Sequence, residues 1–150
     1  MIEDKIYIYG KHALEEALIN TPKAVKKVFL ASNINDAKLD DLIFKAGISK
    51  SKLGSGLLGG VTDSAVHQGV IGLISLSGII RPYKEFADSL KICPDTSLIL
   101  LDELQDPHNV GAVIRSAAAF GVSGILIPEH NQAGVTGSVI KVSAGMAFRI

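Results

Sequence analysis

The sequence predicts an α/β fold with mainly parallel strands. Short apolar runs alternate with segments whose apolar residues recur at helical spacing, and glycine or proline separates many of them. The 150 residues are 47% hydrophobic and 20% charged, which is enough apolar sequence to form a buried core. A chain of this length makes one ordinary domain or two very small ones.

The first half of the chain predicts three strands and two helices. Strands, rich in β-branched and aromatic residues, are expected at Lys5–Tyr9, Val25–Ala31 and Val70–Leu76. The third is apolar throughout, which indicates a buried central strand. Helices are expected at His12–Ile19 and from a cap at Asn35 to Ala46, and Ser49–Gly60 is expected to be a loop.

The second half begins with a change in composition. Ser77–Asp95 carries two prolines, scattered charges and one short helical stretch near Tyr83–Leu90, and this predicts a linker. After it come two expected buried strands, Ser97–Leu101 and Gly124–Ile127, and two expected helices, Asn109–Phe120 and Val135–Val142. We therefore expect a first domain at residues 1–76, a linker at 77–95 and a second unit at 96–150.

Composition excludes several classes of protein. Fifteen basic residues balance fifteen acidic ones, so the chain is not a strongly basic nucleic-acid binder, although a local basic patch remains compatible with this balance. Cys93 is the single cysteine, so no disulfide forms within the chain, and this fits the reducing cytoplasm. No apolar run of about 18 residues predicts a membrane helix, and the N-terminus does not resemble a signal peptide.

Candidate ligand sites outside the second unit are few. The four histidines are too scattered to predict a metal site, and ordinary surface or turn positions explain them: His12, His67, His108 and His130. Gly54–Gly60 is glycine-rich but lacks the pattern of a phosphate-binding loop. Six lysines form a candidate patch for binding a nucleic acid, against the ordinary alternative of solvated side chains: Lys23, Lys26, Lys27, Lys45, Lys50 and Lys52.

The polar segment Asp102–Asn109 is the first candidate site. It follows an apolar strand and opens a helix, and ligands of parallel sheets bind beyond the carboxyl ends of the strands. Pro107 restricts the turn, and Asn109 suits the N-cap position of the helix. A capped strand-to-helix loop without any ligand explains the same residues.

Arg115 favours a functional interpretation of this helix. It is the one charged residue between His108 and Pro128. Its neighbours one helical turn away are small, so a ligand or another backbone could approach it: Gly111, Ala112, Ala118 and Ala119. A buried guanidinium needs a partner, because an unpaired buried charge is costly. An internal carboxylate (Asp102 or Asp106), a phosphate and a second subunit are the alternatives.

The segment Leu100–Gly121 resembles the first motif of the SpoU/TrmH family of RNA ribose 2′-O-methyltransferases, in the SPOUT superfamily. The matching features are an Asp-Pro-x-Asn-x-Gly core, an arginine six residues after the asparagine, and a closing Ala-Phe-Gly. Gly10–Leu18, His67–Val70 and Gly134–Ile150 also resemble members that act on ribosomal RNA. The resemblance covers nearly the whole chain.

This resemblance implies a small L30e-like α/β substrate-binding domain followed by the first part of a SPOUT (α/β knot) methyltransferase domain. It implies that S-adenosylmethionine donates a methyl group to a ribose 2′-hydroxyl, with ribosomal RNA favoured over transfer RNA. Arg115 would lie at the ribose and phosphate, and Asn109 would shape the active site. Members of the family work as homodimers.

One departure from the family pattern is large. The family's S-adenosylmethionine pocket is built by two further motifs in a C-terminal knot, and neither occurs in these 150 residues. We therefore expect a fragment that is inactive alone, and the cofactor-binding residues stay unassigned. A non-catalytic L30e-like RNA-binding protein is the alternative. A dinucleotide-binding protein ranks last, because Ser97–Gly121 lacks G-x-G-x-x-G.

Overall fold

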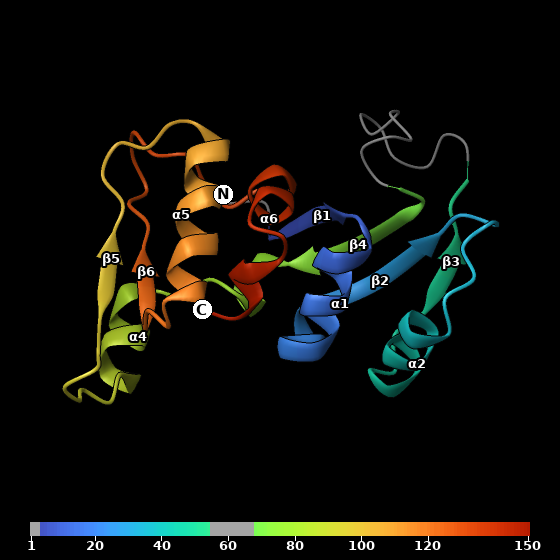
Figure 1. Cartoon of the computed structure of the whole chain (residues 1–150), viewed down its shortest axis with the longest axis horizontal. Helices are drawn as coiled ribbons and strands as arrows, with labels where there is room; N and C mark the ends of the chain where they lie inside the picture. The colour runs from blue at the N-terminus through green and yellow to red at the C-terminus, as the bar shows by residue number, and fades with distance from the viewer. Residues whose placement is uncertain (1–3, 55–67) are drawn as a thin grey trace.

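The computed structural model describes residues 4–54 and 68–150. They form a four-stranded sheet and a two-stranded sheet, with α6 lying between α5 and β1 (Figure 1). The larger sheet has the order β1-β4-β2-β3 and consists of β1 (Lys5–Tyr9), β2 (Val25–Leu30), β3 (Lys50–Lys52) and β4 (Val70–Ser75). The smaller sheet pairs β5 (Leu98–Leu100) with β6 (Gly124–Leu126).

The helices occur close to their expected positions. They are α1 (Lys11–Asn20), α2 (Ala37–Lys45), α4 (Tyr83–Ser89), α5 (Pro107–Ala119) and α6 (Gly137–Val142). Three 3-10 turns complete the described structure: η1 (Pro22–Ala24), η2 (Leu76–Gly78) and η3 (Met146–Phe148). The expected loop beyond Gly54 and the expected match at His67 lie outside the described residues.

The expectation of mainly parallel strands is wrong for the larger sheet. β4 lies between β1 and β2 and is antiparallel to both, while only β2 with β3 and β5 with β6 are parallel. The prediction that β4 is a buried central strand is confirmed, since all of its residues except Leu73 are buried. A strand flanked on both sides and covered on both faces needs apolar residues at every position, whatever its direction.

β3 was not expected, because Ser49–Gly60 predicted a loop. Its sequence, Lys-Ser-Lys, is polar and carries no apolar alternation. The strand exists because its backbone pairs with β2, where Lys50 lies opposite Val28 and Lys52 opposite Leu30. Pairing with a neighbour, rather than side-chain burial, therefore creates this strand.

Both expected helix caps are displaced. Asp36, not Asn35, caps α2 and accepts a hydrogen bond from the Leu39 amide at 3.1 Å. Asp106, not Asn109, caps α5 and accepts from the His108 amide at 2.9 Å. Pro107 explains the second displacement, because proline lacks an amide hydrogen and is favoured at the first helical position. The helix therefore begins at Pro107.

One apolar core crosses the expected boundary between the two halves. It joins buried side chains of β1, α1 and β4 to those of α5, α6 and η3. Small residues permit the close approaches. A β-carbon added to Gly111 of α5 would lie 2.7 Å from the β-carbon of Val142 in α6. One added to Gly145 would lie 2.9 Å from the β-carbon of Glu16 in α1. The C-terminal helix is thus packed against both halves.

An ion pair strengthens the contact between α1 and the C-terminal segment. Arg149 donates two hydrogen bonds to the Glu16 carboxylate, at 2.6 and 2.7 Å. The Arg149 guanidinium lowers the pKa of Glu16, and the Glu16 carboxylate raises the pKa of Arg149. Folded protein therefore binds fewer protons at Glu16 than unfolded protein does in the acid range.

We expect Glu16→Gln to lower the stability of the chain at neutral pH but not in strong acid. The stabilisation is present above the ordinary pKa of a glutamate and is lost as pH falls through the lowered pKa. Urea unfolding of both proteins across this range measures the difference. Asp41→Asn, which removes an exposed pair with Lys45, is the matched control and should change little. An equal loss for Glu16→Gln at every pH would contradict the argument.

Candidate functional site

Hydrogen bonds join the loops that follow β5 and β6, at the carboxyl ends of the two strands. The Leu104 amide donates to the Gln132 side-chain oxygen at 2.9 Å, and the Gln132 amide nitrogen donates to the Leu104 carbonyl at 2.8 Å. The Ala133 backbone amide also donates to the Leu104 carbonyl at 2.8 Å. This two-way bond holds the segment that leads into α5, and so holds the start of the helix.

Arg115 lies on the exposed side of α5. The opposite side packs into the core as expected, with Val110, Ile114 and Ala117 buried and Val113 half-buried. Of the three alternatives for its partner, the described residues do not show the internal carboxylate, a phosphate and a second subunit stay predictions, and the guanidinium is not buried. It is exposed, and within residues 4–54 and 68–150 it makes no hydrogen bond or ion pair with Asp102, Asp106 or any other group. Its charge is therefore available to a ligand.

Asn109 lies in the first turn of α5 and is also exposed. Asn109 and Arg115 are six residues apart, which is about 9 Å along the helix axis and about 120° around it. The two side chains therefore leave α5 in different directions. A single ligand that reaches both must wrap around this part of the helix.

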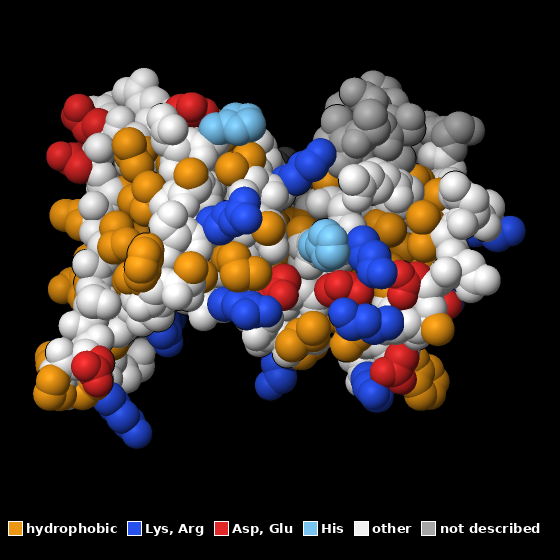
Figure 2. All heavy atoms as spheres, in the orientation of Figure 1, with side chains coloured by type: hydrophobic (Ala, Val, Ile, Leu, Met, Phe, Trp, Pro, Cys, Tyr) orange, Lys and Arg blue, Asp and Glu red, His pale blue; other side chains and the backbone are white. Residues whose placement is uncertain are grey.

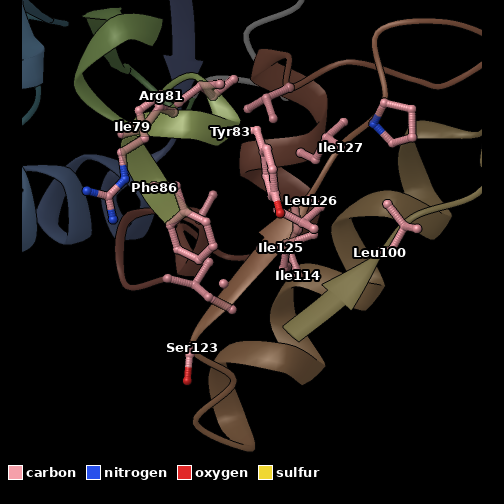
Figure 3. Close-up of a pocket in the computed structure, with 16 residues that line it drawn as sticks. Ile79, Arg81, Tyr83, Phe86, Leu100, Ile114, Ser123, Ile125, Leu126 and Ile127 are labelled. Carbon is pink, nitrogen blue, oxygen red and sulfur yellow. The ribbon is translucent and has the colours of Figure 1, made fainter. Parts of the chain in front are cut away.

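An apolar groove of about 380 Å³ lies along β6. In Figure 3, Tyr83 and Phe86 of α4 lie beside Ile125 and Leu126 of β6, and Arg81 lies near the Phe86 ring. The Arg81 guanidinium carbon is 5.2 Å from the centre of that ring. The lining includes no carboxylate, and Arg81 is its one charged residue. Its other polar side chains are the hydroxyls of Tyr83 and Ser123, so the groove offers few side-chain partners to the polar groups of S-adenosylmethionine.

The outer side of the smaller sheet differs from the expectation of a buried strand at Ser97–Leu101. Leu98 is 43% exposed and Leu100 is 66% exposed, while Leu101, just beyond β5, is buried. In β5, Ile99 packs against the core, so the alternation of side chains along the strand places Leu98 and Leu100 on the opposite side. The apolar run therefore produces an exposed apolar surface.

The six lysines of the candidate RNA patch do not gather on one surface. Lys50 and Lys52 alternate with Ser51, whose strand partner is Phe29, so they face the opposite side of the sheet from Phe29. Lys27 lies on the Phe29 side, with its ammonium 5.3 Å from the ring centre. Lys50 pairs with Asp40 at 2.8 Å and Lys45 with Asp41 at 2.7 Å. Near η1, the Lys26 ammonium donates to the Lys23 carbonyl.

Sequence reasoning missed a surface on the side of the larger sheet that faces away from α1 and α2. We name it the aromatic face, and it consists of Lys5, Tyr7, Tyr9, Lys27, Phe29, Ile71 and Leu73. Alternation in the segments Lys-Ile-Tyr-Ile-Tyr and Lys-Val-Phe carried the signal. Every second residue there is aromatic or basic, which places those residues on one side of a strand.

Charged groups of both signs occupy the opposite side of the molecule. Figure 2 shows Lys and Arg side chains over α5, α6 and α1, and acidic side chains beside them over α1 and α2. Lys11 pairs with Asp36, and this contact lowers the pKa of Asp36 and raises that of Lys11. The buried carboxylate of Glu15 faces Lys38 at 3.3 Å and Lys11 at 3.8 Å. Most of these charges therefore have partners inside the chain, unlike Arg115.

The described part of the chain shows neither a metal-binding cluster nor a membrane-spanning helix. It contains no cluster of three or more His, Cys, Asp or Glu side chains arranged to hold a metal ion. None of its helices is long and apolar enough to cross a membrane.

Two family models match the chain. The model described as RNA 2′-O ribose methyltransferase substrate binding matches residues 7–77, and the model described as SpoU rRNA Methylase family matches residues 96–150. The second match contains the whole of α5.

Similar proteins include 23S rRNA (guanosine-2′-O-)-methyltransferase RlmB of Shewanella oneidensis, 34% identical over 144 residues, which cover 93% of this chain and 58% of the relative. RlmB of Neisseria meningitidis serogroup B is 32% identical over 143 residues, which cover 93% of this chain and 56% of the relative. The chain thus spans somewhat more than half the length of these relatives.

Solved structures share the fold. The SpoU methyltransferase AviRb from Streptomyces viridochromogenes, in complex with AdoMet, matches with a TM-score of 0.72 at 19% identity over 98% of this chain and 52% of that one. The AdoMet-bound rRNA methyltransferase from Sinorhizobium meliloti matches with a TM-score of 0.70 at 20% identity over 98% and 52%. The solved structures show the shared fold, and the two family models and the RlmB relatives show that the chain belongs to the SpoU family of RNA methyltransferases.

Proposed function

We propose that the chain takes part in methylation of a ribose 2′-hydroxyl of RNA, with S-adenosylmethionine as the methyl donor and ribosomal RNA as the substrate. The observation that carries this proposal is the Arg115 guanidinium, exposed on α5 within the family motif and unpaired in the described part of the chain. The named relatives act on 23S ribosomal RNA, which supports ribosomal rather than transfer RNA.

Arg115 is proposed as the group that holds the RNA at the reacting ribose. A guanidinium can donate two parallel hydrogen bonds to a phosphate, and its positive charge lowers the pKa of a nearby hydroxyl. It stays protonated at all ordinary pH values, so it positions the ribose rather than accepting the proton. Asn109, on another side of the same helix, is proposed to shape the site through its amide group.

The lysines of the first half are proposed as weaker contacts to RNA phosphates. Lys23, Lys26 and Lys52 are exposed, whereas Lys50 must give up its pair with Asp40 to bind RNA. We therefore assign Lys50 a smaller share of RNA affinity than Lys27.

Three further parts of the proposal concern organisation. We propose that residues 1–76 bind RNA, that 77–95 connect the halves and that 96–150 begin the methyltransferase domain. We also propose a homodimer in the cytoplasm. The exposed Leu98, Leu100 and Phe120 support the dimer, because apolar side chains of this size favour a contact with another subunit. The single cysteine supports a reducing compartment.

The experiment that tests the function compares two forms of the protein. One is the 150-residue chain, and the other is the protein purified from its own cells, with its intact mass measured. Each is incubated with labelled S-adenosylmethionine and ribosomal RNA from a strain that lacks the gene. We expect the cell-derived protein to label one ribose of the RNA and the 150-residue chain to label none. No labelled ribose with either form would contradict the proposal, and transfer by the 150 residues would contradict their expected inactivity.

A further inference from the structure

The aromatic face presents aromatic rings and ammonium groups together. Across the sheet, Tyr7 lies opposite Leu73, and Leu73 lies opposite Lys27. In the next row, Tyr9 lies opposite Ile71, and Ile71 lies opposite Phe29. Each row therefore ends in a tyrosine on β1, which is the edge strand of the sheet.

The aromatic rings of this face are close to one another and to a cation. The centres of the Tyr7 and Phe29 rings are 6.4 Å apart, with an angle of 55° between the rings. The Lys27 ammonium lies 5.3 Å from the centre of the Phe29 ring, within the range of a cation–π interaction. Phe29 is buried, which anchors the group, whereas Tyr7, Tyr9 and Leu73 are half-buried and keep accessible surface.

A hollow adjoins the two tyrosines at the point where the halves of the chain meet. Its volume is about 450 Å³, within the range of ligand pockets, and it is lined by Lys5, Ile6, Tyr7, Tyr9, Leu73 and Gly137. Gly137, the first residue of α6, lies directly against β1 at the border of this hollow, because a β-carbon there would lie 2.9 Å from the Tyr9 ring and overlap the Tyr7 carbonyl. The hollow is thus continuous with the methyltransferase half.

The charges of the aromatic face favour a polyanion. Lys5 and Lys27 lie on it, and among the described strand residues of this face there is no carboxylate. The nearest acidic group along the chain, Asp4, accepts hydrogen bonds from the Ser75 hydroxyl at 3.0 Å and the Ser77 amide at 3.2 Å. A second copy of the chain would bring lysines against lysines, so a nucleic acid suits this face better than self-association.

We infer that the aromatic face binds unpaired nucleotides of the RNA substrate, with bases stacked on Tyr7 and Tyr9 and phosphates held by Lys5 and Lys27. The inference rests on the proposed function, since it assigns a place to that RNA. Stacking on aromatic side chains requires bases that are not enclosed in a duplex. The face therefore selects single-stranded RNA and holds it beside α6.

Tyrosine fluorescence tests this inference directly. The chain has no tryptophan and three tyrosines, two of which lie on the aromatic face, while the third, Tyr83, lies on α4. We expect a short oligouridine to quench the tyrosine emission and to bind more tightly than a duplex of equal length. Tyr7→Leu should weaken binding by about tenfold, the loss typical of one stacked base. Lys27→Ala should reduce the salt dependence by about one counterion.

Matched substitutions outside the aromatic face are the controls. Tyr83→Leu and Lys91→Ala change an exposed tyrosine and an exposed lysine and should leave the affinity unchanged. Thermal melting checks that each variant folds. If Tyr7→Leu unfolds, Lys27→Ala and the fluorescence of the unaltered chain still decide the matter.

Three results would overturn the inference. They are unchanged fluorescence on binding, equal affinity of the Tyr7→Leu, Lys27→Ala and unaltered chains, and the absence of oligouridine binding. The methylation assay reports separately on the proposed function. Binding that ignores the aromatic face, together with intact methylation, refutes this inference alone. Quenching and variant effects without any methylation refute the proposed function alone.

Discussion

Arg115→Ala is expected to reduce the rate of RNA methylation by about 10²–10³-fold, the loss seen when one preorganised charge-stabilising donor is removed from an active site. The side chain is exposed and makes no hydrogen bond or ion pair within the described chain, so the variant should fold normally. The measurement is the rate of methyl incorporation by protein purified from its own cells, with urea unfolding measured in parallel.

Two further variants separate charge from geometry at this position. Arg115→Lys keeps the positive charge but loses the paired hydrogen bonds, so its rate should lie between those of the unaltered protein and Arg115→Ala. Ser116→Ala, which changes the next exposed residue of α5, should keep the full rate. A wild-type rate for Arg115→Ala would remove Arg115 from the mechanism.

Ile140→Ala is expected to lower the free energy of unfolding by about 2–5 kcal/mol, the usual cost of truncating a buried isoleucine. Ile140 lies in α6 and has no exposed surface. It belongs to the core cluster that also contains Ile8 of β1 and Leu14 of α1. The loss should therefore reach both halves of the chain, and unfolding in urea should remain one transition.

Hydrogen exchange tests whether the two halves are energetically joined. In the Ile140→Ala variant, amides of β1 and β4 should lose protection together with those of α6. Ile92→Ala is the control, because Ile92 is 84% exposed and its truncation should cost little. Full protection of β1 beside an unprotected α6 would show that the halves unfold separately.

Much of the fold was predictable because each element carries its own local signal. A run of β-branched and aromatic residues predicted β1, and a continuous apolar run predicted β4. The start of α5 could also be predicted from the sequence, since Pro107 favours the first helical position and makes Asp106 the cap. Two adjacent candidates, Asn35 and Asp36, have similar capping chemistry, so only the structure could choose between them.

The errors arose where distant residues decide the structure. β3 has no apolar pattern and depends on pairing with β2, and strand direction in the larger sheet depends on β4 entering between β1 and β2. The exposure of Leu98 and Leu100 depends on which segments cover β5. At the candidate site, the family motif predicted Arg115 but not its exposure. The aromatic face emerged only from the strand register, which aligns residues of β1, β2 and β4.

The strand order has a consequence for how the chain is made. β1 pairs with β4, and Lys5 lies opposite Ser75. The larger sheet can therefore form only after Ser75 has left the ribosome. The core is completed later still, when the segment containing Val139 and Phe148 arrives. Closing contacts between residues so distant in sequence is slow and leaves apolar surface uncovered meanwhile. The N-terminal half therefore has to stay unaggregated during synthesis until β4 and the C-terminal segment are available to it.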